Sequence, residues 1–197
     1  MEKELIEQAK AMFDTPEKWN AFLELFWQRD EIRNQWYSKL KEEANKRFKR
    51  VDSENGWSFN SWGFWDMHWY LTADGDKSIS LLLGWWGELT LFCDENYFDT
   101  VKITELLKTE KFAPLLSGFN RIDRFFERGR IAIEIRNFSF ASVYDSHFDL
   151  ERLAWFAGNK TEDFLNQIVN KVNIYREDEK MTSLISELNQ LTKKNIE

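Results

Sequence analysis

The chain has 197 residues, a formal net charge of −7 and a pI of about 5.1. Hydrophobic residues make up 43% and charged residues 31%, which is typical of a globular protein and not of a disordered or fibrous one. The acidic balance argues against a dedicated binder of duplex DNA, because such proteins carry a basic surface. A single cysteine, Cys93, excludes a disulfide framework or a multi-thiolate metal site within one chain.

No apolar run approaches the roughly 20 residues that a membrane-spanning helix needs. The first ten residues, MEKELIEQAK, are charged and lack the apolar centre of a signal peptide. These features predict a cytoplasmic protein.

Two helices are predicted before residue 53. Apolar residues recur at helical spacing over 3–13, and Asp14-Thr15-Pro16 is typical of a helix start. The periodicity then continues from Trp19 to Phe48 and predicts an amphipathic helix over about 16–50. The charged run 28–33 is expected to kink or split that helix, and a turn over 53–56 ends it.

Period-two alternation follows, within a stretch that holds six of the ten tryptophans. It predicts one strand with a bend at Gly63, in which apolar odd-numbered residues form a buried face. These residues are Trp57, Phe59, Trp65, Met67, Trp69 and Leu71. Asp74-Gly75 predicts a hairpin turn, and further strands are expected over 78–86 and 88–93. Residues 57–94 should therefore form a three-stranded antiparallel meander.

The second half alternates between helices and one strand. Asp99 is expected to cap a helix over about 100–110, and a further apolar-periodic helix should run from Pro114 to Gly129. A hairpin arm is the competing interpretation of 114–128. A strand is predicted over 130–143, and helices are predicted from Asp149 to Gly158, from Thr161 onward, and over 178–194.

This order of elements predicts an α+β fold: a mainly antiparallel sheet, formed by the meander 57–94 and strand 130–143, packed by N- and C-terminal helices. Residues 1–177 are expected to form one domain. The amphipathic segment 178–197 should either dock on that domain or mediate an interaction, such as a homodimer through 178–194.

Both histidines occur as Asp-X-His, in the pairs Asp66–His68 and Asp145–His147. Residues i and i+2 of a strand share a face, so two converging pairs would supply ligands for a divalent metal or a base with its orienting acid. This is the hypothesis of a metal-dependent hydrolase or nuclease-like enzyme. Ordinary hydrogen-bonded histidines are the competing interpretation.

One local basic cluster exists: Arg121, Arg124, Arg128 and Arg130. Arginines beside aromatic residues can bind phosphate and stack on bases, which suggests a nucleic-acid-binding accessory domain. On a helix, however, Asp123 and Glu127 would interleave with them, as expected for a solvated charged face.

Cys93 is predicted to be a small core residue. The acids that follow it, Asp94 and Glu95, should raise the pKa of its thiol, which does not suit a nucleophile.

The meander also predicts aromatic side chains on its second face, namely Trp62, Phe64, Tyr70 and Trp86. Exposed aromatic patches usually mark interaction surfaces. Since the chain shows no recognisable catalytic constellation, the sequence favours a non-catalytic protein that binds a protein partner, for example a basic one, in the manner of an inhibitor or adaptor. No cofactor is expected.

Overall fold

The computed structural model describes residues 2–52, 56–62, 66–84, 89–117, 119, 121–122, 129–133 and 150–195. Its elements in chain order are α1 (Glu2–Met12), α2 (Pro16–Asp52), β1 (Trp57–Trp62), β2 (Asp66–Leu71), β3 (Ser80–Leu83), β4 (Leu89–Phe92), α3 (Thr100–Leu107), the 3-10 helix η1 (Ala113–Leu116), β5 (Arg121–Ile122), β6 (Arg130–Ile133), α4 (Leu150–Asn159), α5 (Thr161–Arg176) and α6 (Glu179–Thr192).

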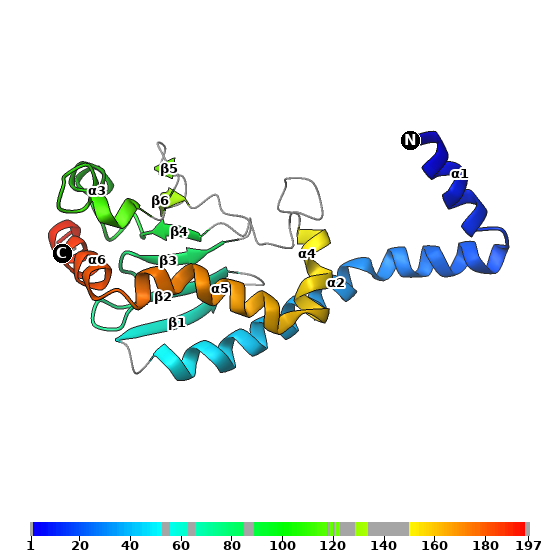
Figure 1. Cartoon of the computed structure of the whole chain (residues 1–197), viewed down its shortest axis with the longest axis horizontal. Helices are drawn as coiled ribbons and strands as arrows, with labels where there is room; N and C mark the ends of the chain where they lie inside the picture. Colours follow the sequence, from blue (N-terminus) through cyan, green and yellow to red (C-terminus); the bar gives the residue numbers. More distant parts are fainter. Residues whose placement is uncertain are drawn as a thin grey trace.

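The described strands form one antiparallel sheet in the order β1-β2-β3-β4-β6-β5. The last turns of α2, together with α5, lie across one face of this sheet, while α3 and α6 lie at one end of it (Figure 1). The predicted α+β class, with an antiparallel sheet packed by helices from both ends of the chain, is therefore confirmed.

Residues 57–71 form a hairpin of two strands, so the prediction of one bent strand is wrong. The alternating residues still share a face, because Trp57 pairs with Leu71 and Phe59 pairs with Trp69. Odd-numbered residues thus face odd-numbered residues across the hairpin, and the same parity continues into β3 and β4. Of the six predicted core residues of this stretch, Trp65 lies outside the described residues.

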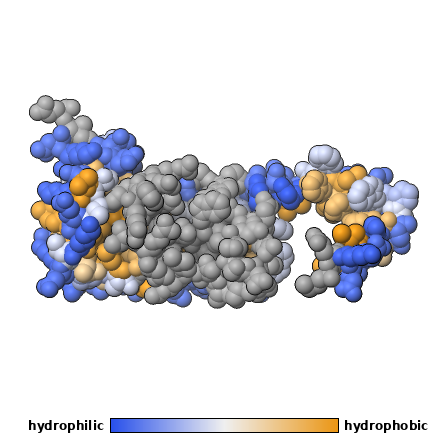
Figure 2. Space-filling model, turned by 90° about the horizontal axis from the view of Figure 1, so that it is seen from above, coloured by the Kyte–Doolittle hydropathy of each residue, from blue (hydrophilic) through white to orange (hydrophobic). Residues whose placement is uncertain are grey.

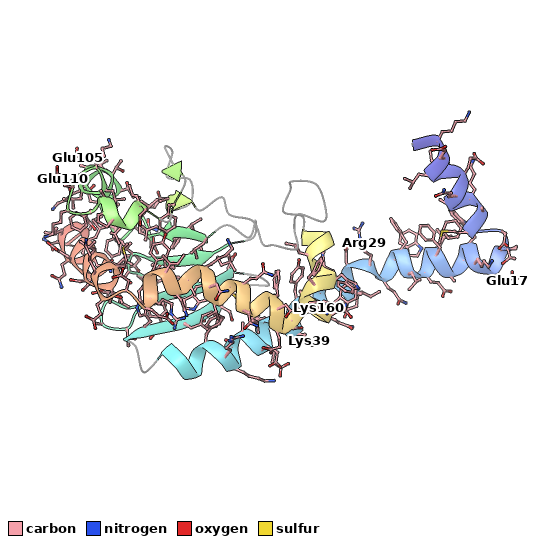
Figure 3. The ribbon with its side chains drawn as sticks, in the orientation of Figure 1. Glu17, Arg29, Lys39, Glu105, Glu110 and Lys160 are labelled. Atoms are coloured by element: carbon pink, nitrogen blue, oxygen red, sulfur yellow. The ribbon has the colours of Figure 1, made fainter. Side chains whose placement is uncertain are left out.

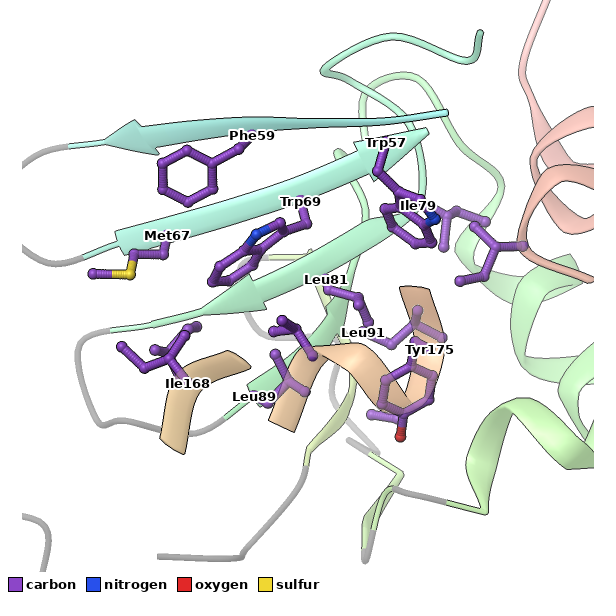
Figure 4. Close-up of a cluster of buried hydrophobic side chains, with 14 of the residues drawn as sticks. Trp57, Phe59, Met67, Trp69, Ile79, Leu81, Leu89, Leu91, Ile168 and Tyr175 are labelled. Atoms are coloured by element: carbon purple, nitrogen blue, oxygen red, sulfur yellow. The ribbon is translucent and has the colours of Figure 1, made fainter. Parts of the chain in front are cut away.

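The predicted core face is buried wherever the structure describes it. Trp57, Met67 and Trp69 are at most 1% exposed, and the odd-numbered leucines of β3 and β4 are equally buried. Figure 4 shows these side chains between the sheet and α5, toward Ile168 and Tyr175. Phe48, from the last turns of α2, contacts Trp69 edge to face, with 5.0 Å between ring centroids. The described tryptophans of this face, Trp57 and Trp69, are therefore core residues.

Helix α2 is one helix of 37 residues, so the expected split at 28–33 is wrong. The helix contains no glycine, and its only proline is the first residue, Pro16, where proline is tolerated. Within the charged run, Arg33 pairs with Asp30 at 3.3 Å and Gln35 donates to Glu31 at 3.0 Å. Such contacts one turn apart support a helix and do not interrupt it.

Residues 121–122 form strand β5, so the helix predicted from Pro114 to Gly129 is wrong there and the competing hairpin describes these residues. Ile122 pairs with Ala132 of β6. Gly129 has a positive φ of 80° and its carbonyl accepts a hydrogen bond of 2.8 Å from the Cys93 amide. It therefore leads into β6, which runs beside β4, instead of ending a helix.

The described part of the strand predicted over 130–143 is β6, residues 130–133, and 134–143 lie outside the described residues. Its pairing with β4 shifts register between Leu91 and Phe92, where Phe92 is opposite Arg130. Ala132 therefore takes the position opposite Leu91 on the core face. This bulge changes the face alternation that a simple strand would have.

Two predicted helix ends can be compared with the structure. Asp99 caps α3 as predicted, because its carboxylate accepts from the Lys102 amide at 3.0 Å. Gly158, by contrast, lies inside α4: a Cβ there would come within 2.1 Å of the Trp36 ring. Glycine at this position allows α2 and α4 to pack closely, and α4 ends one residue later, at Asn159, near the predicted end.

Helix α6 packs against the rest of the chain. It buries Met181, Leu184, Ile185 and Leu188 and contacts α3, α5 and η1. Asn189 joins it to the sheet, accepting from the Ile79 amide at 2.7 Å and donating to Asp74 at 3.0 Å. A homodimer through 178–194 stays a prediction.

Candidate functional site

The second face of the sheet is built around a buried polar pair. His68 of β2 and Ser80 of β3 are both wholly buried, and His68 Nε2 lies 2.6 Å from Ser80 Oγ. The His68 ring also lies 5.2 Å from that of Tyr70 and meets Phe92 edge to face. A serine and a histidine at this distance resemble a nucleophile with its base. Both are buried, however, as expected for a structural hydrogen bond.

The charge state of His68 agrees with a structural role. Burial lowers the pKa of His68 to about 4, an effect that Asp76 partly opposes and Lys77 reinforces. The imidazole is therefore neutral at pH 7.

The metal hypothesis finds limited support in the described residues. Asp66 and His68 share a face of β2 as predicted, but Nε2 of His68 is engaged by Ser80. Within the described ranges, no three His, Cys, Asp or Glu side chains gather as a metal site. Asp145 and His147 lie outside the described residues, so the convergence of the two Asp-X-His pairs stays a prediction.

The predicted aromatic set on this face is described only in part. Tyr70 is half-buried. Trp62 ends β1 opposite Asp66, while Phe64 and Trp86 lie outside the described residues. Between these positions the face is covered, since Ser80 and Thr90 are at most 2% exposed. The described part is therefore no bare aromatic patch, and the set of four stays a prediction.

The predicted arginine cluster does not share one helix. Arg121 lies in β5 opposite Ile133, and Arg130 lies in β6 opposite Phe92. Arg124 and Arg128 lie outside the described residues. The helical interleaving with Asp123 and Glu127 cannot include Arg121, and nucleic-acid binding through this cluster stays a prediction.

Cys93 is a core residue, as the sequence predicts. It is wholly buried. Burial, together with the charges of Asp94 and Glu95, raises the pKa of its thiol to about 12. The thiol is therefore inert at neutral pH.

The largest exposed apolar surface that the structure describes lies elsewhere, on α1 and the first half of α2. We call residues 2–31 the arm, because this part of the chain projects away from the sheet (Figure 1). Figure 3 shows Glu17 at its far end and Arg29 where α2 leaves the domain. Eight large apolar side chains of the arm are 38% to 77% exposed: Leu5, Ile6, Met12, Trp19, Phe22, Leu25, Phe26 and Trp27.

The aromatic rings of the arm form a row that joins the two helices. Phe13, which follows α1, lies 4.7 Å from Phe22 and 5.4 Å from Trp19, measured between ring centroids. Phe26 continues the row beyond Phe22, and Trp27 lies against Phe26. Figure 2 shows the resulting hydrophobic surface over the arm, apart from the body of the molecule. The rings contact each other but remain open to solvent.

This row belongs to the same side of α2 that enters the core. Trp19, Leu23 and Phe26 recur at the spacing that later brings Tyr37, Leu40, Ala44 and Phe48 to a single buried side. At position 30 the stripe is interrupted by the Asp30–Arg33 ion pair. Beyond this polar break the stripe is covered by α4, α5 and β1, whereas before it the stripe is exposed.

The stripe was predicted from the sequence, but its exposure was not. Periodicity identifies an apolar face and does not show whether anything covers it. One signal was present: 37 residues at about 1.5 Å each give a helix of roughly 55 Å, and about 30 Å already spans a small domain. A helix of this length has to extend beyond its own domain.

Neither a protein family, a curated protein nor a solved structure matches this chain. In the described ranges, none of the helices has the length and apolarity needed to cross a bilayer.

Proposed function

We propose that this chain is a non-catalytic binding protein that docks on a protein partner through the apolar face of its arm. The observation that carries the proposal is the exposure of the arm stripe, where Trp19 is 47% and Phe26 is 52% exposed. Contiguous exposed apolar surface of this kind is characteristic of protein interfaces, and aromatic side chains contribute most of the binding energy there.

The charge of the arm favours a protein over a membrane or a nucleic acid. Residues 2–31 carry eight acidic and four basic side chains. Helices that lie on membranes are usually rich in lysine and arginine on their polar face, and nucleic-acid surfaces are basic. An amphipathic helical face with an acidic polar side instead fits an apolar surface on another helical protein. As part of this proposal we place the protein in the cytoplasm, where its buried, unpaired Cys93 needs no disulfide partner.

The aromatic sheet face predicted from the sequence is a second surface for the same function. Tyr70 is its one member whose side chain is described, and it is half-buried. The arm offers more exposed aromatic surface than this, and we therefore assign the primary contact to the arm.

A photo-crosslinking experiment tests the proposal. Benzoylphenylalanine placed at Phe26 is expected to form a covalent protein adduct on irradiation in cells, because the ring would lie inside the interface. The matched control is the same group at Val101, which is 68% exposed on α3, away from the arm. Equal adduct yields at the two positions, or none at either, would contradict the proposal.

A further inference from the structure

We propose that the partner of the arm is the arm of a second copy of this chain, so that the exposed halves of two α2 helices pack antiparallel. This inference rests on the proposed function, since it names the occupant of the same surface. It follows from the area of the surface, from its position relative to the domain, and from the shape of the arm.

The exposed area reaches that of a specific dimer. An aromatic side chain buries about 150–250 Å², and the three aromatic residues of the stripe, Trp19, Phe22 and Phe26, between 38% and 52% exposed, present roughly 300 Å². The exposed aliphatic side chains of α1, Leu5, Ile6 and Met12, add a similar area. Two arms face to face therefore remove roughly 1,200 Å² from solvent, the lower end of the range for a specific interface.

The domain sets the direction in which a second copy can bind. The buried residues Tyr37, Leu40 and Phe48 show that the stripe of α2 faces the sheet and α4. The exposed part of the stripe lies on the same side of the helix. Figure 1 shows α1 and the sheet on one side of α2. A second α2 running in the same direction would place its domain in the space of the first. When the second α2 runs in the opposite direction, the two domains lie at opposite ends of the paired arms.

Helix α1 does not cover the stripe of α2. Figure 1 shows it pointing away from α2, beyond Phe13, whose ring contacts Trp19 and Phe22. It has 11 residues, which is short for a stable isolated helix, and its apolar residues Leu5 and Met12 stay exposed. A two-fold axis lets each copy cover the other with the same surface.

The limits of the apolar stripe place the two-fold axis. The contact can extend from Trp19 to Trp27, because the Asp30–Arg33 ion pair follows and the chain turns back before Pro16. The centre of that segment is Leu23. In the antiparallel arrangement Leu23 meets its own copy, whereas the two copies of Asp30 lie about 20 Å apart along the helix, at 1.5 Å per residue.

The first test is the mass of the full chain in solution by sedimentation equilibrium. We expect a species of twice 23.7 kDa, and a 23.7 kDa species for the double variant Phe22→Asp/Phe26→Asp. Four carboxylates buried in one apolar interface should weaken association by more than about 100-fold. The matched control, Val101→Asp/Ile174→Asp, changes exposed apolar residues outside the arm and should remain dimeric.

Circular dichroism of the double variant checks that the domain stays folded, and a second test uses single cysteines. On oxidation, Leu23→Cys should give a disulfide-linked dimer and Asp30→Cys should not, while the buried Cys93 takes no part. Efficient linkage at both positions would refute the antiparallel arrangement. A wild-type chain that stays at 23.7 kDa at tens of micromolar would overturn the dimer. In that case an adduct of benzoylphenylalanine at position 26 with a different protein would leave the proposed function standing.

Discussion

At the scale of single residues, His68 ties stability to pH. Its imidazole is buried and neutral in the folded protein, with a pKa of about 4, against 6.5 for the exposed side chain. Between these two values the unfolded chain binds a proton that the folded chain does not. Stability is therefore complete above pH 6.5 and is lost as the pH falls toward 4.

The expected loss through His68 is about 2 kcal/mol at pH 5 and about 3 kcal/mol at pH 4. Urea unfolding of the wild type and of His68→Gln at pH 7, 5 and 4 measures this loss. The carboxylates titrate in both proteins, so the difference between the two pH profiles reports His68 alone. The wild type should lose more stability on acidification than the variant does. Parallel pH profiles for the two proteins would show that His68 does not cause the dependence.

A comparison of alanine substitutions at Gly129 and Gly75 distinguishes backbone strain from steric conflict. Both have positive φ, 80° and 82°, but a Cβ at Gly129 would lie 2.1 Å from the Cys93 carbonyl oxygen, while nothing lies within 4 Å at Gly75. Gly75→Ala should cost about 1–2 kcal/mol, the penalty of a left-handed conformation. Gly129→Ala should cost clearly more, since β4 and β6 must move apart. Equal losses in chemical denaturation would contradict this assignment.

At the scale of the element, α2 combines two environments in one helix. Phe48 is 1% exposed against Phe59 and Trp69, and Phe26 is 52% exposed on the same stripe. The same residue type on the same helix face is thus core in one half and surface in the other.

Phe48→Ala should lower the free energy of unfolding by about 3–5 kcal/mol, as expected for a large core aromatic residue. Phe26→Ala should change it by less than about 0.5 kcal/mol when measured at a concentration too low for association. Denaturant unfolding of both variants provides the comparison. A large loss for Phe26→Ala in the monomer would mean that the arm packs on its own domain.

The elements also show which sequence signals were sufficient. Alternation predicted the core face of the sheet even though it missed the turn between β1 and β2, because the hairpin register joins odd to odd residues. The turn itself was hidden, since apolar residues continue through Trp62, Phe64 and Trp65. The helix predicted over 114–128 failed because pairing of β5 with β6 is a long-range choice that local periodicity does not encode.

At the scale of the whole molecule, the domain and the arm depend on each other little. Described contacts between the sheet, α4, α5 and α6 build one core, and the arm projects beyond it. The α+β class followed from the order of periodic segments. The candidate interface could not be predicted in this way. The exposure of the stripe depends on how far α2 extends past the domain and not on which residues form the stripe.

Removal of residues 1–30 should therefore leave the domain folded, with a midpoint of thermal unfolding close to that of the undimerised full chain. Scanning calorimetry at low concentration compares the two. The arm variant Phe22→Asp/Phe26→Asp serves as the monomeric reference. A truncated chain that fails to unfold cooperatively would show that the arm contributes to the core.

The unbroken α2 also fixes the position of a docked partner relative to the sheet. From Pro16 to Asp52 it contains no residue that would allow a hinge, and its last turns are fixed against Phe59 and Trp69. Whatever docks on Trp19 and Phe26 is held at a set distance and azimuth from the sheet. One alanine inserted after Arg29 would extend the helix by about 1.5 Å and turn the arm by about 100° around its axis. The docked partner would keep its contacts and face a different side of the domain.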